Sequence, residues 1–139
     1  MKNLMCCFSI LILLLSCNKQ NSNLKKIDGE WKIINYARTN NEGLTTKYSS
    51  CNGTIDFVAD NGKFDLNLVY QNNGFNDSTI ASGNFQLNEN GSAIIISNSL
   101  GMNLSIEGNY RILTLTSTDL QIEGGDTLGN INTYLLSRK

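Results

Sequence analysis

The 139-residue chain contains no histidine and no proline. Histidine is the commonest general base and a frequent zinc ligand, so its absence removes both roles. The acidic residues are spread singly along the chain, with no pair suited to glycoside hydrolysis. Cys51 or a serine would need another group to activate it as a nucleophile. We therefore expect a protein without enzymatic activity, catalytic residues, a bound metal or a cofactor.

Neither sign of charge dominates the chain, which has 11 lysine and arginine residues against 12 aspartate and glutamate residues. Recognition of nucleic acid or of an anionic membrane surface would favour a basic patch or stripe. The sequence has none. We therefore expect no nucleic-acid partner and no electrostatic attachment to a membrane.

The longest almost wholly apolar run, residues 4–15, is shorter than the roughly 20 apolar residues that a membrane-spanning helix needs. Lys2 stands just ahead of this run. A positive residue followed by a short apolar segment is typical of a secretory signal peptide, which we predict for residues 1–16. The mature chain would begin at Cys17 and has the length of one domain with a modest core.

The four cysteines do not form a disulfide framework. Cys6 and Cys7 lie in the predicted signal peptide and Cys17 follows its end, which leaves Cys51 alone. A leftover cysteine in an exported chain indicates a free thiol or an intermolecular bridge. For Cys51, a redox role, a bridge and a small half-buried residue all stay open. The lack of a basic residue beside it in the sequence favours the last.

The residues LLSC at 14–17 resemble a bacterial lipobox, in which an apolar residue, a tolerant position and a small residue precede a cysteine. In such signals the cysteine sulfur receives a diacylglycerol, and the amine freed by cleavage is then acylated. The resemblance implies that Cys17 is the lipidated N-terminus. One acyl chain holds a protein to a membrane only marginally, whereas two or more anchor it firmly. We therefore expect a lipoprotein attached to the membrane through Cys17.

The residues after Cys17 bear on its location. Asn18 is not the aspartate that often retains lipoproteins at the inner membrane, so the resemblance implies the outer membrane. Some Gram-negative groups export lipoproteins to the cell surface through an acidic cluster just past the cysteine, and residues 18–21 contain no acid. This favours a periplasm-facing protein over a surface-exposed one.

Two regions follow the predicted signal peptide. Residues 17–26 are polar without an apolar period, which predicts a lipidated N-terminus and flexible tether. Residues 27–139 alternate apolar and polar positions between clusters of Asn, Asp and Gly, which supply the positive φ angles of tight hairpins. This pattern predicts an all-β domain, an antiparallel meander that closes into a small eight- or nine-stranded barrel. We expect strands at 30–37, 53–58, 63–70, 78–87, 92–98, 101–107, 109–116, 118–123 and 131–137.

The gap at residues 39–50 is the exception to this regular spacing. It is either a lid over one end of the barrel or a surface loop, because long connections are more often functional or mobile than packed.

Gly29 and Trp31 form a Gly-x-Trp motif at the start of the first expected strand. This motif, the run GNYRILTLTSTDLQI and the final YLLSRK make residues 27–139 resemble the lipocalin-like domains of small bacterial lipoproteins. The resemblance implies that Gly29 permits a tight entry of the chain and that Trp31 plugs the closed end of the barrel. It also implies an arginine packed on Trp31, for which Arg138 and Arg111 are candidates.

The expected inward side chains include many large apolar and aromatic residues. A barrel of eight strands is wide enough either to be filled by side chains or to hold one small ligand. Bulky inward residues favour a filled interior. Two functions stay open: binding of a small hydrophobic ligand, or a protein–protein module of the envelope that acts as an inhibitor or accessory subunit. For the first, we expect the ligand to enter at the end opposite Trp31 and to contact Tyr70, Phe85 and Tyr110.

Overall fold

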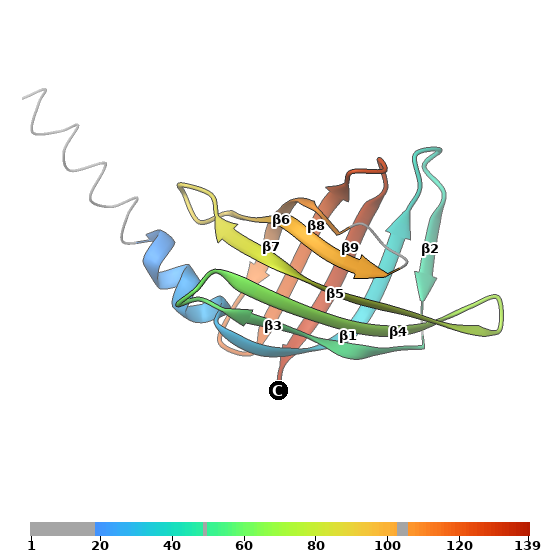
Figure 1. The fold of residues 1–139 in the computed structure, drawn as a ribbon, viewed down its shortest axis with the longest axis horizontal. Helices are drawn as coiled ribbons and strands as arrows, with labels where there is room; N and C mark the ends of the chain where they lie inside the picture. Colours follow the sequence, from blue (N-terminus) through green and yellow to red (C-terminus); the bar gives the residue numbers. More distant parts are fainter. Residues whose placement is uncertain (1–18, 49, 103–105) are drawn as a thin grey trace, which may run out of the picture.

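The computed structural model describes residues 19–48, 50–102 and 106–139. Within these ranges nine strands form one antiparallel sheet in the order β2-β1-β3-β4-β5-β6-β7-β8-β9 (Figure 1). The strands are β1 (Gly29–Thr39), β2 (Thr45–Tyr48), β3 (Cys51–Val58), β4 (Lys63–Asn72), β5 (Phe75–Leu87), β6 (Ala93–Met102), β7 (Gly108–Leu115), β8 (Asp119–Asp126) and β9 (Ile131–Arg138).

The sheet closes because β1 pairs along one edge with β9. Its other edge pairs with two strands in turn: residues 29–32 pair with β3 and residues 36–39 with β2. β2 and β3 therefore share one position in the barrel, which has eight positions and one extra strand. The predicted all-β meander that closes into a small barrel is confirmed. Closure also removes the exposed edges that an open sheet would present.

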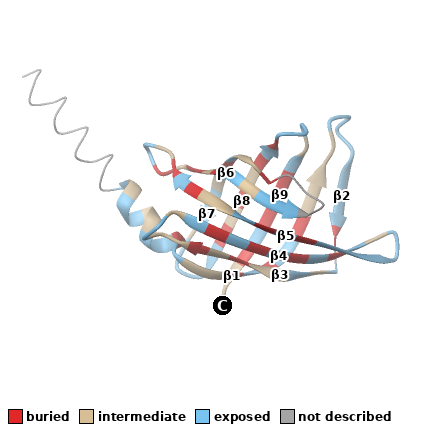
Figure 2. Cartoon of the chain, in the orientation of Figure 1, coloured by how far each residue is buried: buried red, intermediate tan, exposed pale blue. Residues whose placement is uncertain are grey.

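The alternation that predicted the strands also describes the interior. On β4 the side chains of Phe64, Leu66, Leu68 and Tyr70 are buried, whereas the residues between them are exposed. Successive side chains of a strand point to opposite faces, so every second residue reaches the core. Buried positions follow this rule along β4, β8 and β9 (Figure 2).

Two expected connections are different in the structure. The segment 39–50, expected to be a lid or a loop, contains β2, which forms a hairpin with the end of β1. Of the strand expected at 101–107, residues 101 and 102 belong to β6, which runs from Ala93 to Met102, and residues 103–105 lie outside the described residues. Asn98 has a positive φ of 51°, and the pairing of β5 with β6 shifts register between Ser82 and Asn84. A β-bulge within β6 is therefore present where the sequence predicted a turn between two strands.

Residues 19–27, most of which were expected to belong to a tether without regular structure, form a helix. Gln20 Nε2 donates a hydrogen bond to the Leu87 carbonyl (3.2 Å) and Asn23 Nδ2 to the Gly91 carbonyl (2.9 Å). Leu24 packs against the core, and Ile27 is fully buried. These four side chains share one helix face, but two are amides, so no apolar period was visible. A helix this short is marginal alone, and docking on the barrel stabilises it.

Candidate functional site

One end of the barrel is closed around Trp31. This side chain is fully buried, and its Nε1 donates a hydrogen bond of 2.7 Å to the carbonyl of Ile27. The guanidinium carbon of Arg138 lies 4.0 Å from the ring centroid, and Arg138 also donates to the carbonyls of Lys26 and Asp28. Arg111 is on the exterior, where it pairs with Glu123 at 3.1 Å. The arginine packed on Trp31 is therefore Arg138.

Gly29 allows the chain to enter β1 beneath this arginine. Its φ of 101° is in the left-handed region that favours glycine. A Cβ atom at this position would lie 3.2 Å from a guanidinium nitrogen of Arg138. The helix 19–27, Gly29, Trp31 and Arg138 thus close this end together.

The middle of the barrel is filled by side chains. A cavity of about 10 Å³ lies in this part of the interior, lined by residues that include Phe64, Ile96, Tyr110, Ile122 and Tyr134. A cavity needs about 10–15 Å³ to hold a single water molecule. This cavity therefore has no room for a hydrophobic ligand of the size that lipid binding would require.

The opposite end contains a cluster of tyrosines. The ring of Tyr36 is stacked between those of Tyr48 (centroids 5.0 Å apart) and Tyr134 (5.1 Å). Tyr70 meets Tyr48 edge-on at 4.7 Å. Burial raises the pKa of the Tyr36 and Tyr134 hydroxyls. These hydroxyls therefore stay neutral at physiological pH and can donate hydrogen bonds.

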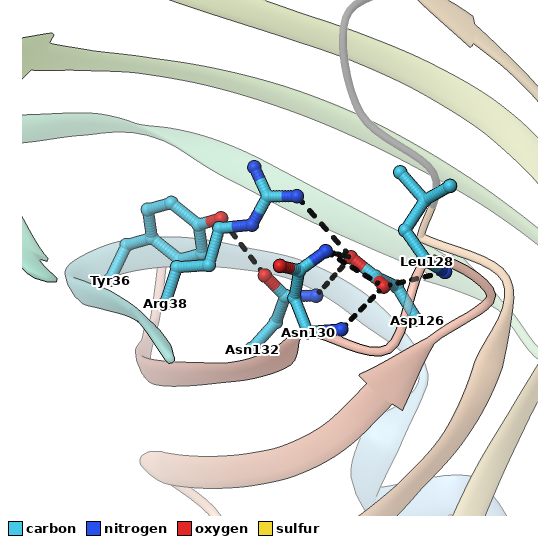
Figure 3. A network of polar contacts seen from close by, with 6 residues as sticks. All are labelled: Tyr36, Arg38, Asp126, Leu128, Asn130 and Asn132. Atoms are coloured by element: carbon cyan, nitrogen blue, oxygen red, sulfur yellow. Dashed lines mark hydrogen bonds and ion pairs between the residues drawn. The ribbon is translucent and has the colours of Figure 1, made fainter. Parts of the chain in front are cut away.

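Asp126 organises the polar groups beside this cluster (Figure 3). Its carboxylate accepts hydrogen bonds from the backbone N–H groups of Leu128 and Asn130, both at 2.9 Å, and from the side-chain amides of Asn130 and Asn132. Asn132 in turn accepts a hydrogen bond of 3.0 Å from the Tyr36 hydroxyl. Burial opposes ionisation of Asp126, but these hydrogen bonds outweigh it and lower its pKa. The β8–β9 turn thus holds an ionised carboxylate next to the tyrosines.

Beside Tyr48, at the edge of the cluster, lies a shallow cup of about 330 Å³ that is open to solvent. The cup lies between the β1–β2 hairpin and the β8–β9 turn, and its lining residues are Arg38, Asn40, Leu44, Thr46, Tyr48 and Asn130. Small-molecule sites commonly have volumes of about 300–1,000 Å³ and combine apolar walls with a few polar groups. This cup is the candidate functional site.

The three residues predicted to contact a ligand are not brought together. Tyr70 lies at the open end within the tyrosine cluster. Tyr110 is fully buried deeper in the barrel, with its ring centroid 6.2 Å from that of Tyr134. Phe85 packs edge-on against Phe57 at 5.0 Å, and Phe57 pairs with Gly29 at the closed end. Phe85 therefore cannot line a mouth opposite Trp31.

Sequence reasoning missed Tyr36, Arg38 and Tyr48, which form much of the open end. The pairing of β1 with β9 shifts register between Ile33 and Asn35, so Ile33 and Tyr36 both point inward. Strict alternation from Trp31 would have placed Tyr36 and Arg38 outside. Tyr48 was missed because its segment was assigned to a loop. The one local feature that could have pointed to these residues is the INYAR sequence at 34–38, which contains Tyr36 and Arg38 and follows the Gly-x-Trp motif.

The remaining sequence-derived candidates are Cys51, the predicted signal peptide with Cys17, and any metal site or membrane-spanning helix. Cys51 is a half-buried free cysteine, and burial raises the pKa of its thiol. The predicted signal peptide and Cys17 lie outside the described residues. In the described part of the chain, no three His, Cys, Asp or Glu residues are grouped as metal ligands would be. Among the same residues, no helix has the length and hydropathy needed to cross a membrane.

The fold is that of a small antiparallel barrel with one closed end and one open end. A family model described as a lipocalin-like domain matches residues 27–122, and the chain belongs to this family. A structure of bovine odorant-binding protein in complex with a selenium-containing odorant aligns with a TM-score of 0.50 at 15% identity, covering 84% of this chain and 75% of that one.

Two further structures align less closely. The bovine odorant-binding protein with undecanal has a TM-score of 0.49 at 14% identity, covering 81% and 71% of the two chains. A redesigned β-barrel has a TM-score of 0.44 at 15% identity, covering 84% and 94%. No curated protein matched the chain. At these identities the likeness concerns the fold alone.

Proposed function

We propose that this protein is a lipid-anchored lipoprotein of the bacterial outer membrane whose lipocalin-like domain binds a small molecule at the open end of the barrel. The observation that carries the proposal is the contrast between the two spaces. The cup at the mouth has about 330 Å³, whereas the interior has about 10 Å³. A ligand would therefore rest against Tyr48, at the edge of the tyrosine cluster, rather than enter the barrel.

The proposed anchor would also set the orientation of the barrel relative to the membrane. Cys17, in its lipobox-like sequence, would carry the acyl chains, and the helix 19–27 begins two residues later. This helix is docked at the Trp31 end through Gln20, Asn23 and Ile27. An acylated Cys17 would hold the closed end toward the bilayer, and the mouth would face away from it, into the periplasm.

Blocking the cup tests the proposal. Thr46 lines the cup, and a Thr46→Trp substitution would fill much of it. The matched control is Lys47→Trp, which places the same side chain one residue later on the outer face of β2, where Lys47 borders an external groove. The full-length protein, purified from membranes in detergent, is extracted with organic solvent, and the extract is compared among the variants by mass spectrometry.

The expected result is a small molecule in stoichiometric amount with the wild type and Lys47→Trp, and its loss with Thr46→Trp. A thermal-shift screen with small amphiphiles gives a second readout, because ligand at 100 times its Kd stabilises a protein by about 2.7 kcal/mol. An empty extract together with no thermal shift for any compound would refute binding at the mouth.

A second candidate function, a protein–protein module of the envelope, is favoured by one observation on the outer surface. Ile80 and Leu100 are 61% and 80% exposed, and Val69 is 41% exposed. The registers place Val69 opposite Ser78 and Leu100 opposite Ser82, so both are diagonal neighbours of Ile80 on the outer face of β4–β6. Exposed apolar patches often mark interaction sites.

Substitution of this patch separates the two candidates. Ile80→Glu combined with Leu100→Glu should abolish in-cell crosslinking to an envelope protein while the folded barrel persists. Unchanged crosslinking would exclude this face. If the double substitution abolishes crosslinking and the solvent extract of the wild type contains no small molecule, the protein–protein module is favoured over the ligand-binding protein.

A further inference from the structure

Buried polar atoms without partners lie in the middle of the barrel and toward its open end. In the described part of the chain, four buried side-chain atoms make no hydrogen bond of good geometry: Arg38 Nε, Thr79 Oγ1, Tyr110 OH and Tyr134 OH. Of these, Thr79 and Tyr110 still interact with the side chains of Tyr70 and Asn132. Tyr134 interacts electrostatically with Tyr110, Tyr36 and Arg38, and Thr79 is a neighbour of Tyr70. Most buried polar groups in native proteins are paired, so such a concentration requires an explanation.

The chemistry of these atoms indicates what would satisfy them. Arg38 Nε can only donate a hydrogen bond, and each of the three hydroxyls can donate one. All four can therefore serve an acceptor group. The 10 Å³ cavity beside Tyr110 and Tyr134 has room for about one water molecule and can explain those two. Arg38 lines the cup, so its partner would come from there.

The guanidinium of Arg38 is held only weakly by its neighbour. Its terminal nitrogen is 3.6 Å from Asp126 Oδ2, which is beyond hydrogen-bond length. Both oxygens of Asp126 already accept shorter hydrogen bonds from the β8–β9 turn and from Asn132 (Figure 3). Arg38 can therefore turn toward a ligand while the Asp126 carboxylate keeps its partners.

We infer that the cup recognises a small monocarboxylate, whose oxygens accept hydrogen bonds from the Arg38 guanidinium while its apolar body lies against Leu44 and Tyr48. This rests on the proposed function and specifies its ligand class. The planar fork of an arginine matches a carboxylate with two parallel hydrogen bonds. Leu44 and Tyr48 supply the apolar surface of the cup.

The charges around the cup favour one negative charge over two. Arg38 is the only cationic residue in its lining. Asp126 is ionised beside it, and Asp77 is exposed close enough to Tyr70 to raise its pKa. A dianionic phosphate would meet repulsion from both carboxylates with one arginine to offset it. A monocarboxylate meets this repulsion for one charge instead of two, and the hydrogen bonds that Asp126 accepts from the β8–β9 turn already offset part of its charge.

The test compares acids with their neutral amides. Phenylacetate, indole-3-acetate and octanoate are titrated by calorimetry into the full-length protein in detergent, each against its amide and against protein-free micelles. At least one acid should bind, and its amide should bind at least about tenfold more weakly. Arg38→Gln should weaken binding of that acid roughly ten- to hundredfold, as expected for loss of hydrogen bonds to a charged group. The matched control, Arg111→Gln, removes the same charge from the exterior and should change nothing.

Two further measurements keep the test decisive if Arg38→Gln folds poorly. Arg38→Lys keeps the charge without the fork and should bind the acid with intermediate affinity. In the wild type, the NMR signal of the Arg38 Nε–H should shift on addition of the acid and stay unchanged with the amide.

The outcomes distinguish this inference from the proposed function. Equal binding of acid and amide that Thr46→Trp blocks and Arg38→Gln does not affect would overturn the inference and leave small-molecule binding at the mouth intact. If none of the acids binds, the inference also fails. If the solvent extract and the thermal-shift screen are negative as well, the proposed function fails with it.

Discussion

Trp31 offers the sharpest test of how the closed end is built. Its ring is fully buried, lies under the Arg138 guanidinium and is fixed by a 2.7 Å hydrogen bond to the Ile27 carbonyl. Replacing a buried tryptophan by alanine typically costs about 3–5 kcal/mol, because the apolar contacts are lost and a cavity remains. We expect Trp31→Ala to lower the free energy of unfolding by about this amount.

Two milder substitutions separate the contributions of the Trp31 hydrogen bond and of Arg138 to this loss of stability. Trp31→Phe keeps most of the ring but leaves the Ile27 carbonyl without its donor, which should cost about 1–3 kcal/mol. Arg138→Lys keeps a cation near the ring but removes the fork that donates to the carbonyls of Lys26 and Asp28. We expect it to be less destabilising than Trp31→Ala, because the tryptophan stays buried.

The assay is urea unfolding followed by far-UV circular dichroism, since Trp31 is the only tryptophan and fluorescence would be lost with it. Ile34→Ala on the same strand is the control: its side chain is 48% exposed, so it should unfold close to the wild type. An unfolding midpoint for Trp31→Ala that equals that of the control would refute the packing described for the closed end.

Three further predictions concern the anchor, the open end and the helix. Mass spectrometry of the membrane fraction should find a triacylated peptide that begins at Cys17; a soluble wild-type chain that begins elsewhere would contradict the anchor. Because the pKa of Asp126 is lowered in the folded state, its contribution to stability is present above the ordinary carboxyl pKa of about 3.9 and is lost as pH falls through the lower folded value. Asp126→Asn should therefore flatten the acid limb of the stability profile, and an unchanged profile would argue against an ionised Asp126. Gln20→Ala with Asn23→Ala should expose residues 19–27 to proteolysis while leaving the barrel intact, whereas equal protection in this variant would show that the two amides do not hold the helix.

The strands were largely predictable because alternation is a local property. Phe64, Leu66, Leu68 and Tyr70 alternate with polar residues, and all four are buried on β4. The Asn- and Gly-rich clusters marked the β3–β4, β4–β5 and β5–β6 turns, where Gly62, Gly74 and Gly91 have positive φ angles. The Gly-x-Trp motif indicated the lipocalin-like family, to which the chain belongs.

The open end was not predictable in the same way. Tyr36 and Arg38 face inward because the β1–β9 pairing shifts register after Ile33, and such a shift depends on a strand about 100 residues later in the chain. Tyr48 enters the cluster because β2 pairs with the end of β1. Both facts are set by long-range pairing, which no local pattern reports.

The all-β class, the family, the position of the Trp31 end and the prediction of an anchor at Cys17 all followed from local sequence patterns. Each of these depends on residues that are neighbours in the chain, because alternation, turn chemistry and a signal sequence are local. Long-range packing sets the contact of Arg138 with Trp31, the filling of the interior by side chains, and the meeting of Arg38 with the tyrosines at the mouth. These outcomes depend on how the volumes and registers of distant strands combine when the barrel closes.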